Sequence, residues 1–152
     1  PERYAFIPLA AHVTTHREIP LDSAVVLSPE AGGAYKLYAR DVLDLPLNAR
    51  LVTLSACRSA GSRAFAGEGL VGLAWAFMSA GARNVVGGLW DVEDASTAEL
   101  MEHLYGGLRR GHDPARALRD AKLRLLRSDT AFRKPFYWAP FVVYHGPSGL
   151  DR

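Results

Sequence analysis

The stretch that decides the fold is LVTLSAC at residues 51–57, an apolar run that ends at the one cysteine of the chain. The run is rich in β-branched residues, and the turn-forming residues Gly61 and Ser62 follow it. A continuous apolar run of this length is typical of a strand buried on both faces of a parallel sheet. Open α/β sheets place their chemistry at the carboxyl ends of such strands, so the sequence predicts a functional role for Cys57.

A second apolar run, YAFIPLAA at residues 4–11, ends at His12. If the two strands are parallel neighbours, their carboxyl ends lie about 5 Å apart at one edge of the sheet. The imidazole of His12 then faces the thiol of Cys57. An imidazole that takes the thiol proton lowers the pKa of the thiol and raises the fraction of reactive thiolate at neutral pH. The spacing of the two residues is close to the roughly 50 positions that separate histidine and cysteine in caspase-type proteases.

Two simpler interpretations compete with this pair. A lone cysteine is most often a small buried hydrophobe. His12 and His16 would form a metal pair if they lay on a helix, but Pro8 and the apolar run argue against a helix there. Only Cys57 would add a soft third ligand. The position of both residues at strand ends favours a nucleophile and base over a metal site, and no cofactor is predicted.

The remaining chain alternates helices and strands. Ser96 and Glu99 are spaced as a capping box, and Asp113 with Pro114 has the usual order of a cap followed by proline. This alternation predicts a three-layer α/β domain with a mostly parallel central sheet flanked by helices. We expect a helix from Gly67 to residues 80–83, a strand over 84–89, helices over 94–110 and 114–128, and an aromatic strand over 136–144 with a bulge or edge at Pro140.

Composition limits the function classes. The 152 residues are 49% hydrophobic, which supports a single domain over residues 1–152. A net charge of +2 provides no strong field for nucleic acid or membranes. The late arginines alternate with leucines at helical spacing and without interleaved aromatics, which indicates a solvated helix face and no direct nucleic-acid partner.

The apolar residues 70–90 do not predict a membrane span. Arg83 and Asn84 divide them into a helix and a strand, so no continuous run of about twenty apolar residues remains. The chain shows no secretory signal, and one cysteine cannot form an internal disulfide. These features predict a protein of the reducing cytoplasm.

Several motifs occur in the order found in one known family. The chain resembles the CHAT domain family, caspase-like domains often found after tetratricopeptide repeats, within the caspase, separase and legumain group of cysteine proteases. The resemblance extends from about residue 4 to residue 146. The motifs are Ala10-Ala11-His12, Pro20 to Ala24, Leu27-Ser28-Pro29, Leu54 to Cys57, Gly67 to Leu70, Ala74 to Gly81, Leu89 to Val92 with Asp94 and Thr97, Leu104-Tyr105, and Phe136 to Ala139 with Phe141.

The resemblance implies a catalytic dyad in which Cys57 attacks a peptide carbonyl and His12 transfers the protons. It also implies an oxyanion hole formed by the backbone amides of Val13 and Cys57. Trp90, Asp91 and Asp94 would then line a substrate cleft, where acidic groups favour a basic residue of the substrate. The implied partners are a protein substrate and an upstream repeat or sensor domain in the same chain, in a setting of bacterial signalling.

The same resemblance implies that the first elements of the caspase-like fold are missing. Residue 1 is proline, and an apolar strand begins almost at once. We therefore expect residues 1–152 to be the C-terminal fragment of a longer protein.

Three functions follow, and the sequence leaves them open. The first is a cysteine endopeptidase that forms an acyl-enzyme. The second is a proteolytically inactive caspase-like module for protein binding or signalling, because Val13 stands where the family usually has glycine and Pro8 lies in the histidine strand. The third is nucleic-acid binding through the late arginines, which would depend strongly on salt.

Overall fold

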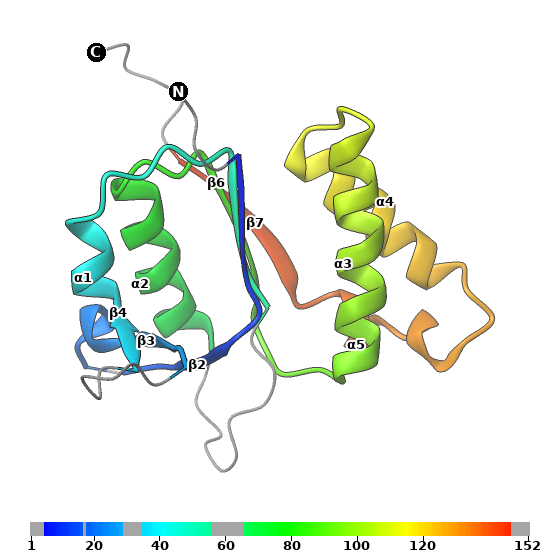
Figure 1. The fold of residues 1–152 in the computed structure, drawn as a ribbon. Coiled ribbons are helices and arrows are strands. Elements are labelled where there is room, and N and C mark those ends of the chain that lie inside the picture. The colour runs from blue at the N-terminus through cyan, green and yellow to red at the C-terminus, as the bar shows by residue number, and fades with distance from the viewer. Residues whose placement is uncertain (1–4, 17, 29–34, 56–65, 147–152) are drawn as a thin grey trace.

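A four-stranded sheet lies between two layers of helices in the computed structural model, which describes residues 5–16, 18–28, 35–55 and 66–146 (Figure 1). The spatial order of its strands is β1 (Phe6–Leu9), β5 (Leu51–Leu54), β6 (Asn84–Gly88) and β7 (Phe141–His145). The first three strands are parallel, and β7 is antiparallel to β6. The predicted three-layer α/β fold with a mostly parallel sheet is therefore confirmed.

Helices cover both faces of the sheet (Figure 1). The helices α1 (Ala39–Leu43) and α2 (Ala66–Ser79) lie on one side, whereas α3 (Asp94–Arg109) and α4 (Pro114–Leu126) lie on the other. A small antiparallel sheet beside α1 has the order β2-β3-β4. The short elements are β2 (His12–Thr14), η1 (Pro20–Asp22), β3 (Ala24–Val26), β4 (Lys36–Tyr38), η2 (Ala131–Arg133) and α5 (Pro135–Trp138).

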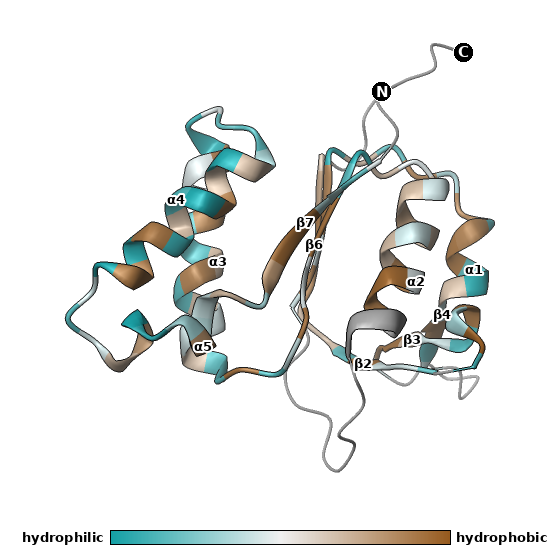
Figure 2. Cartoon of the chain, turned by 180° about the vertical axis from the view of Figure 1, so that it is seen from behind, coloured by the Kyte–Doolittle hydropathy of each residue, from teal (hydrophilic) through white to brown (hydrophobic). Residues whose placement is uncertain are grey.

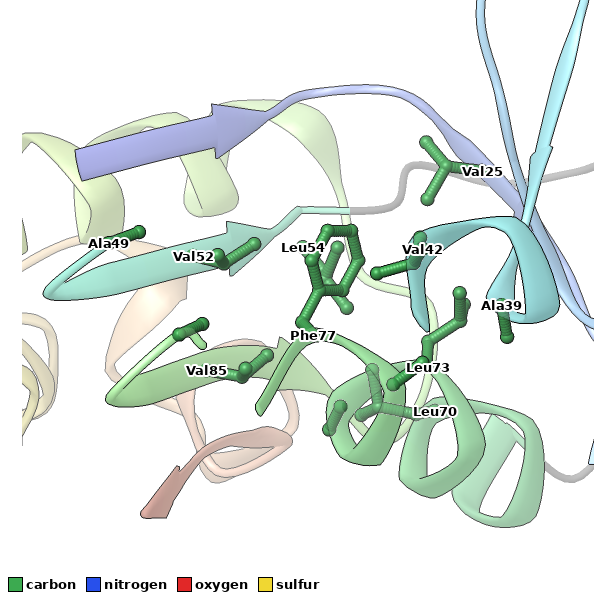
Figure 3. Packing of buried hydrophobic residues seen from close by; sticks show 13 residues of the cluster. Val25, Ala39, Val42, Ala49, Val52, Leu54, Leu70, Leu73, Phe77 and Val85 are labelled. Carbon is green, nitrogen blue, oxygen red and sulfur yellow. The ribbon is translucent and has the colours of Figure 1, made fainter. Parts of the chain in front are cut away.

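The strand β5 is buried along its whole length, as its apolar run predicts. Successive side chains of a strand point to opposite faces, so Val52 and Leu54 pack with α2 while Leu51 packs with α3 and α4. Figure 3 shows Val52 and Leu54 beside Phe77 of α2. The strand thus joins the two cores that the helix layers form.

The helix ends follow the predicted local chemistry. Gly81 after α2 and Gly111 after α3 both have positive φ, at 115° and 86°, a conformation that glycine adopts readily. Asp113 caps α4, because its carboxylate accepts a hydrogen bond from the amide of Arg116 at 2.9 Å. None of the helices in the described ranges has the length and apolar character needed to cross a bilayer.

The aromatic segment 136–144 is not a single strand, contrary to the prediction. Pro135 occupies the first turn of the short helix α5, and β7 begins only after Pro140. Proline is favoured at the start of a helix because its φ is already helical and its missing amide hydrogen has no partner there. The turn lets the indole of Trp138 donate a hydrogen bond to the carbonyl of Arg133 at 3.2 Å.

The predicted capping box at Ser96 is also wrong. The helix α3 begins at Asp94 with Glu93 as its N-cap, so Ser96 lies inside the first turn. Its hydroxyl donates to the carbonyl oxygen of Glu93 at 2.7 Å. The bond therefore joins the side chain to the preceding backbone, as serine commonly does within helices.

Pro8 does not break the ladder between β1 and β5. The carbonyl of Ala5 accepts a hydrogen bond from the amide of Leu51, and the carbonyl of Leu9 accepts one from the amide of Ser55. The backbone N–H and C=O groups of alternate residues of β1 therefore point toward β5, and the backbone nitrogen and C=O group of Pro8 point away from it. Within the described sheet β1 is the edge strand, where proline is tolerated. The predicted strand over residues 4–11 is shorter than expected and ends at Leu9.

Candidate active site

The strands β1 and β5 are adjacent and parallel, so the segments that follow them leave the sheet at the same edge. Their last register pair is Leu9 with Leu54, and the amide of Ser55 still donates to the carbonyl of Leu9 at 3.2 Å. His12 and Cys57 are each the third residue after that pair. Cys57 itself lies outside the described residues. The structure therefore confirms the predicted neighbouring strands, while the position of the thiol stays a prediction.

A cavity of about 400 Å³ opens at this edge. His12 and Ser55 reach it from the ends of the two strands, and Asp94 reaches it from the start of α3. Two of the predicted site residues, His12 and Asp94, are thus brought to one place. The full lining is Ala10, Ala11, His12, Ser55, Asp94, Thr97, Ala98 and Met101.

On the α3 side of the cavity, the sequence predicts Asp94 as a substrate residue and contains Thr97 within a family motif, but it gives no site role to Ala98 or Met101. Thr97, Ala98 and Met101 follow Asp94 at helical spacing, so the four residues occupy one face of α3. The signal that identifies them is the combination of this spacing with the predicted site residue Asp94. Besides the carboxylate of Asp94, this helix face provides the hydroxyl of Thr97 and the flexible apolar side chain of Met101.

His12 begins the short strand β2 and has an exposed side chain. The strand turns away from β1 after Ala10 and Ala11 and pairs with β3. The predicted strand end is therefore a junction between two sheets. Because β2 is held by β3, the backbone on both sides of His12 is held by hydrogen-bonded structure.

The ladder of the small sheet determines the direction of the Val13 amide. The amide of Leu27 donates to the carbonyl of Tyr35, and the amide of Ala39 donates to that of Ser23. The backbone N–H and C=O groups of odd-numbered residues of β3 therefore point toward β4, and those of even-numbered residues point toward β2. His12 and Thr14 pair with those even-numbered residues, so the amide of Val13 points away from β3.

Trp90 and Asp91 lie after β6, and neither is among the described residues that line the cavity. The indole of Trp90 donates to the carbonyl of Phe136 at 3.0 Å, although 40% of the residue remains exposed. Asp91 is exposed. The structure therefore separates the predicted substrate residues into Asp94, which lines the cavity, and a pair that lies outside the lining.

One partly buried hydrogen bond connects α3 with β5, the strand that leads to Cys57. The hydroxyls of Thr53 and Tyr105 are 2.7 Å apart. Burial raises the pKa of the Tyr105 phenol, while the hydrogen bond with Thr53 partly opposes this shift. The phenol is therefore neutral at physiological pH and can hold Thr53 in a fixed position.

Within the described residues, which do not include Cys57, no group of three or more His, Cys, Asp or Glu side chains is arranged to hold an ion. His16 instead accepts a hydrogen bond at Nδ1 from the amide of Ile19 at 3.0 Å. This bond gives His16 a local structural role in the turn before η1.

Comparison with known proteins gives a consistent result. The model of the CHAT domain family matches residues 2–146. Tetratricopeptide repeat protein 28 of Mus musculus is 37% identical over 107 residues, and its Homo sapiens counterpart is 36% identical over the same length. Each match covers 70% of this chain but 4% of the relative, so the chain spans only a small part of the length of these relatives.

Proposed function

Because this chain belongs to the CHAT domain family, we propose that it is a caspase-like cysteine endopeptidase domain with Cys57 as nucleophile and His12 as acid and base. The observation that carries the proposal is the pairing of the parallel strands β1 and β5, whose last paired residues are Leu9 and Leu54. His12 and Cys57 each follow that pair by three residues in the sequence. The cavity at this edge, lined by His12, Ser55 and Asp94, has room for a peptide segment. No part of the proposal requires a cofactor.

In the first half of the reaction, His12 accepts the proton of the Cys57 thiol, and the thiolate attacks the carbonyl carbon of the scissile peptide bond. The protonated imidazole then donates that proton to the leaving amine as the C–N bond breaks. An acyl-enzyme remains at Cys57. A water molecule, deprotonated by His12, attacks the thioester and releases the acid product and the free thiol.

The oxyanion of each tetrahedral intermediate needs backbone donors. The amide of Val13 supports this role, because it points away from β3 and is not required for that ladder. The amide of Cys57 is the second proposed donor. Loss of one such donor typically slows a reaction by about a hundredfold to a thousandfold.

The carboxylate of Asp94 suggests the substrate preference. It lies at the cavity, where a substrate would exclude part of the water and strengthen charge pairing. A basic side chain of the substrate next to the cleaved bond would meet this carboxylate. We propose that Trp90 and Asp91 contact more distant substrate residues, since they lie outside the lining.

A second candidate is an inactive module that binds protein partners. The observation in its favour is Val13, which occupies an extended strand where family members usually have glycine. None of the described non-glycine residues has positive φ, so Val13 does not adopt the conformation that glycine would allow. In either case we propose that the domain works within a longer chain that carries a repeat or sensor domain, since both relatives are named for tetratricopeptide repeats.

The test is covalent labelling of the full-length protein with a thiol-reactive peptide probe that carries arginine next to the reactive group. We expect labelling at Cys57 to persist below about pH 7, well under the pKa of a free thiol. Cys57→Ala should abolish labelling, and His12→Ala should remove the reactivity near neutral pH. His103→Ala is the matched control, because it removes an imidazole that does not line the cavity. Labelling with the pH dependence of a free thiol in wild type and His12→Ala alike would favour the inactive module.

Val13→Pro separates the two candidates further, because it removes the amide hydrogen at a position that does not donate to β3. For an active peptidase we expect the labelling rate to fall about a hundredfold, whereas Val13→Ala keeps the wild-type rate. Urea unfolding of both variants checks that β2 remains folded. Equal labelling of a folded Val13→Pro variant would remove Val13 from the oxyanion hole.

A further inference from the structure

Several positively charged side chains line a cleft between α3 and α4, away from the candidate active site. The cleft has a volume of about 580 Å³. Four arginines line it: Arg109 and Arg110 at the end of α3, and Arg124 and Arg127 at the end of α4. The sequence predicts only a solvated face for these residues, but the packing of α3 against α4 places all four along one cavity, with Arg109 and Arg110 near the turn between the helices and Arg124 and Arg127 further along α4.

The positive charge of this cleft is not cancelled by the chain itself. In the described ranges none of the four arginines forms an ion pair. The carboxylate of Asp120 at the cleft is instead approached by His112 at 3.4 Å, Arg119 at 3.5 Å and Arg116 at 3.8 Å. Its negative charge therefore lies beside Arg116, Arg119 and the imidazole of His112, which leaves Glu102 as the opposing carboxylate of the lining.

Gly106 provides a second, independent observation. A Cβ at the neighbouring Gly107 would lie 3.0 Å from the Cβ of Ala117, so close packing of α3 against α4 explains that glycine. A Cβ at Gly106 would meet only the end of the flexible Arg110 side chain, at 3.4 Å. Helix packing does not require Gly106, although glycine is unfavourable inside a helix. Its position in the cleft wall opens the backbone to close approach by a ligand.

We propose that this cleft binds a compact multivalent anion, an oligophosphate group that two or more of the arginines hold together. The guanidinium fork matches phosphate oxygens in a bidentate arrangement, and each such bond is charge-assisted. The described lining contains no Phe, Tyr or Trp, so it provides no platform for stacked bases of single-stranded nucleic acid. The phosphate chain itself is therefore the recognised group.

This proposal does not depend on the peptidase activity. The amino-terminal half of α3 lines the candidate active site through Asp94, Thr97 and Met101, whereas its carboxyl-terminal half lines the anion cleft. One helix thus contacts both cavities. The binding measurement below can succeed or fail whatever the labelling of Cys57 shows.

The test is calorimetric titration of the full-length protein with sodium tripolyphosphate at constant ionic strength. We expect saturable binding, which Arg109→Ala and Arg124→Ala each weaken about tenfold, in line with the loss of a charge-assisted contact. Glu102→Gln should strengthen binding because it removes the opposing carboxylate. Arg133→Ala is the matched control, since it removes an exposed arginine that is not in the lining.

Gly106→Ala gives a readout that a general loss of folding cannot produce. We expect it to weaken tripolyphosphate binding while raising the melting temperature, because alanine favours the helix and fills the cleft wall. Equal affinity for ATP and tripolyphosphate would identify the phosphate chain as the ligand. Tighter binding of ATP would add the nucleoside to the same site.

Three results would overturn the assignment. The first is the absence of saturable binding up to about 1 mM tripolyphosphate. The second is an equal loss of affinity in Arg133→Ala and the cleft variants, which would indicate a non-specific charge effect. The third is binding of single-stranded RNA without binding of tripolyphosphate, which would indicate an extended nucleic-acid surface in place of a compact site.

Discussion

The helix layers on the two sides of the sheet differ in the character of their outer faces. Both contain a close approach at a glycine, because a Cβ at Gly72 of α2 would lie 2.8 Å from the Cβ of Pro20 in η1, and one at Gly107 of α3 would lie 3.0 Å from the Cβ of Ala117 in α4. Residues 70–79 of α2 contain no charged side chain. The layer of α3 and α4 instead has an apolar inner face and a charged outer face, which Figure 2 shows as hydrophilic colour along α4.

This difference indicates which helix faces are available to bind ligands. The outer face of α2 carries apolar side chains, since Val71 and Trp75 each remain 51% exposed. A helical hairpin with one apolar face keeps its outer face free for ligands. Accordingly, α3 contributes to both cavities described above, whereas α2 contributes mainly to the core.

The two glycines that end α2 and α3 extend this comparison to the packing of the helix ends. We expect Gly81→Ala to cost about 3 kcal/mol in the free energy of unfolding, because its positive φ is combined with a steric conflict with the carbonyl of Leu47. Gly111→Ala should cost only about 1 kcal/mol, because nothing lies within 4 Å of the added Cβ and strain alone remains. Urea unfolding at equal protein concentration measures both values. Equal losses of unfolding free energy in the two variants would show that the end of α2 is not more tightly packed than the end of α3.

The next largest effect concerns the polar contact between α3 and the sheet. We expect Tyr105→Phe to cost about 1–3 kcal/mol, because the hydroxyl of Thr53 is then left buried without its partner. The double variant Tyr105→Phe with Thr53→Val should recover part of this loss in a thermodynamic cycle. Tyr144→Phe is the control, since its hydroxyl forms no hydrogen bond within the described ranges, and we expect a change within about 0.5 kcal/mol. A similar loss at both tyrosines would exclude the hydrogen bond as the cause.

The smallest effect is a pH dependence at the start of α4. Hydrogen bonding from the backbone amide of Arg116 lowers the pKa of Asp113 below the ordinary aspartate range. A lowered folded pKa means that the carboxylate stabilises the fold above its unfolded pKa, and this contribution is lost as the pH falls through the folded pKa. Asp113→Ala should therefore reduce stability at neutral pH, with a difference from wild type that shrinks in acid.

Asp129→Ala is the control for this measurement, because Asp129 is exposed and lies outside the helix caps. Thermal unfolding from pH 7 to pH 3 gives both curves. A difference between wild type and Asp113→Ala that stays constant over this range would mean that the charge of the cap does not contribute.

The main strands and helices are predictable because their signals are local and strong. The apolar run at residues 51–57 contains β5, and Asp113 with Pro114 marks the start of α4. The aromatic segment before β7 misleads, because aromatic side chains favour a strand while Pro135 starts a helical turn. The strands of the small sheet are three residues long, too short for any periodic pattern.

By itself, the sequence determined which residues have the chemistry for a site: His12 and Cys57, each after an apolar run, and Asp94 at the start of a helix. Only the tertiary structure decided which strands are neighbours and which helix face closes the cavity, since pairing between distant segments depends on packing that no local pattern records. The same holds for the arginines of α3 and α4. The sequence shows their charge, but their common cleft exists only because the two helices pack side by side.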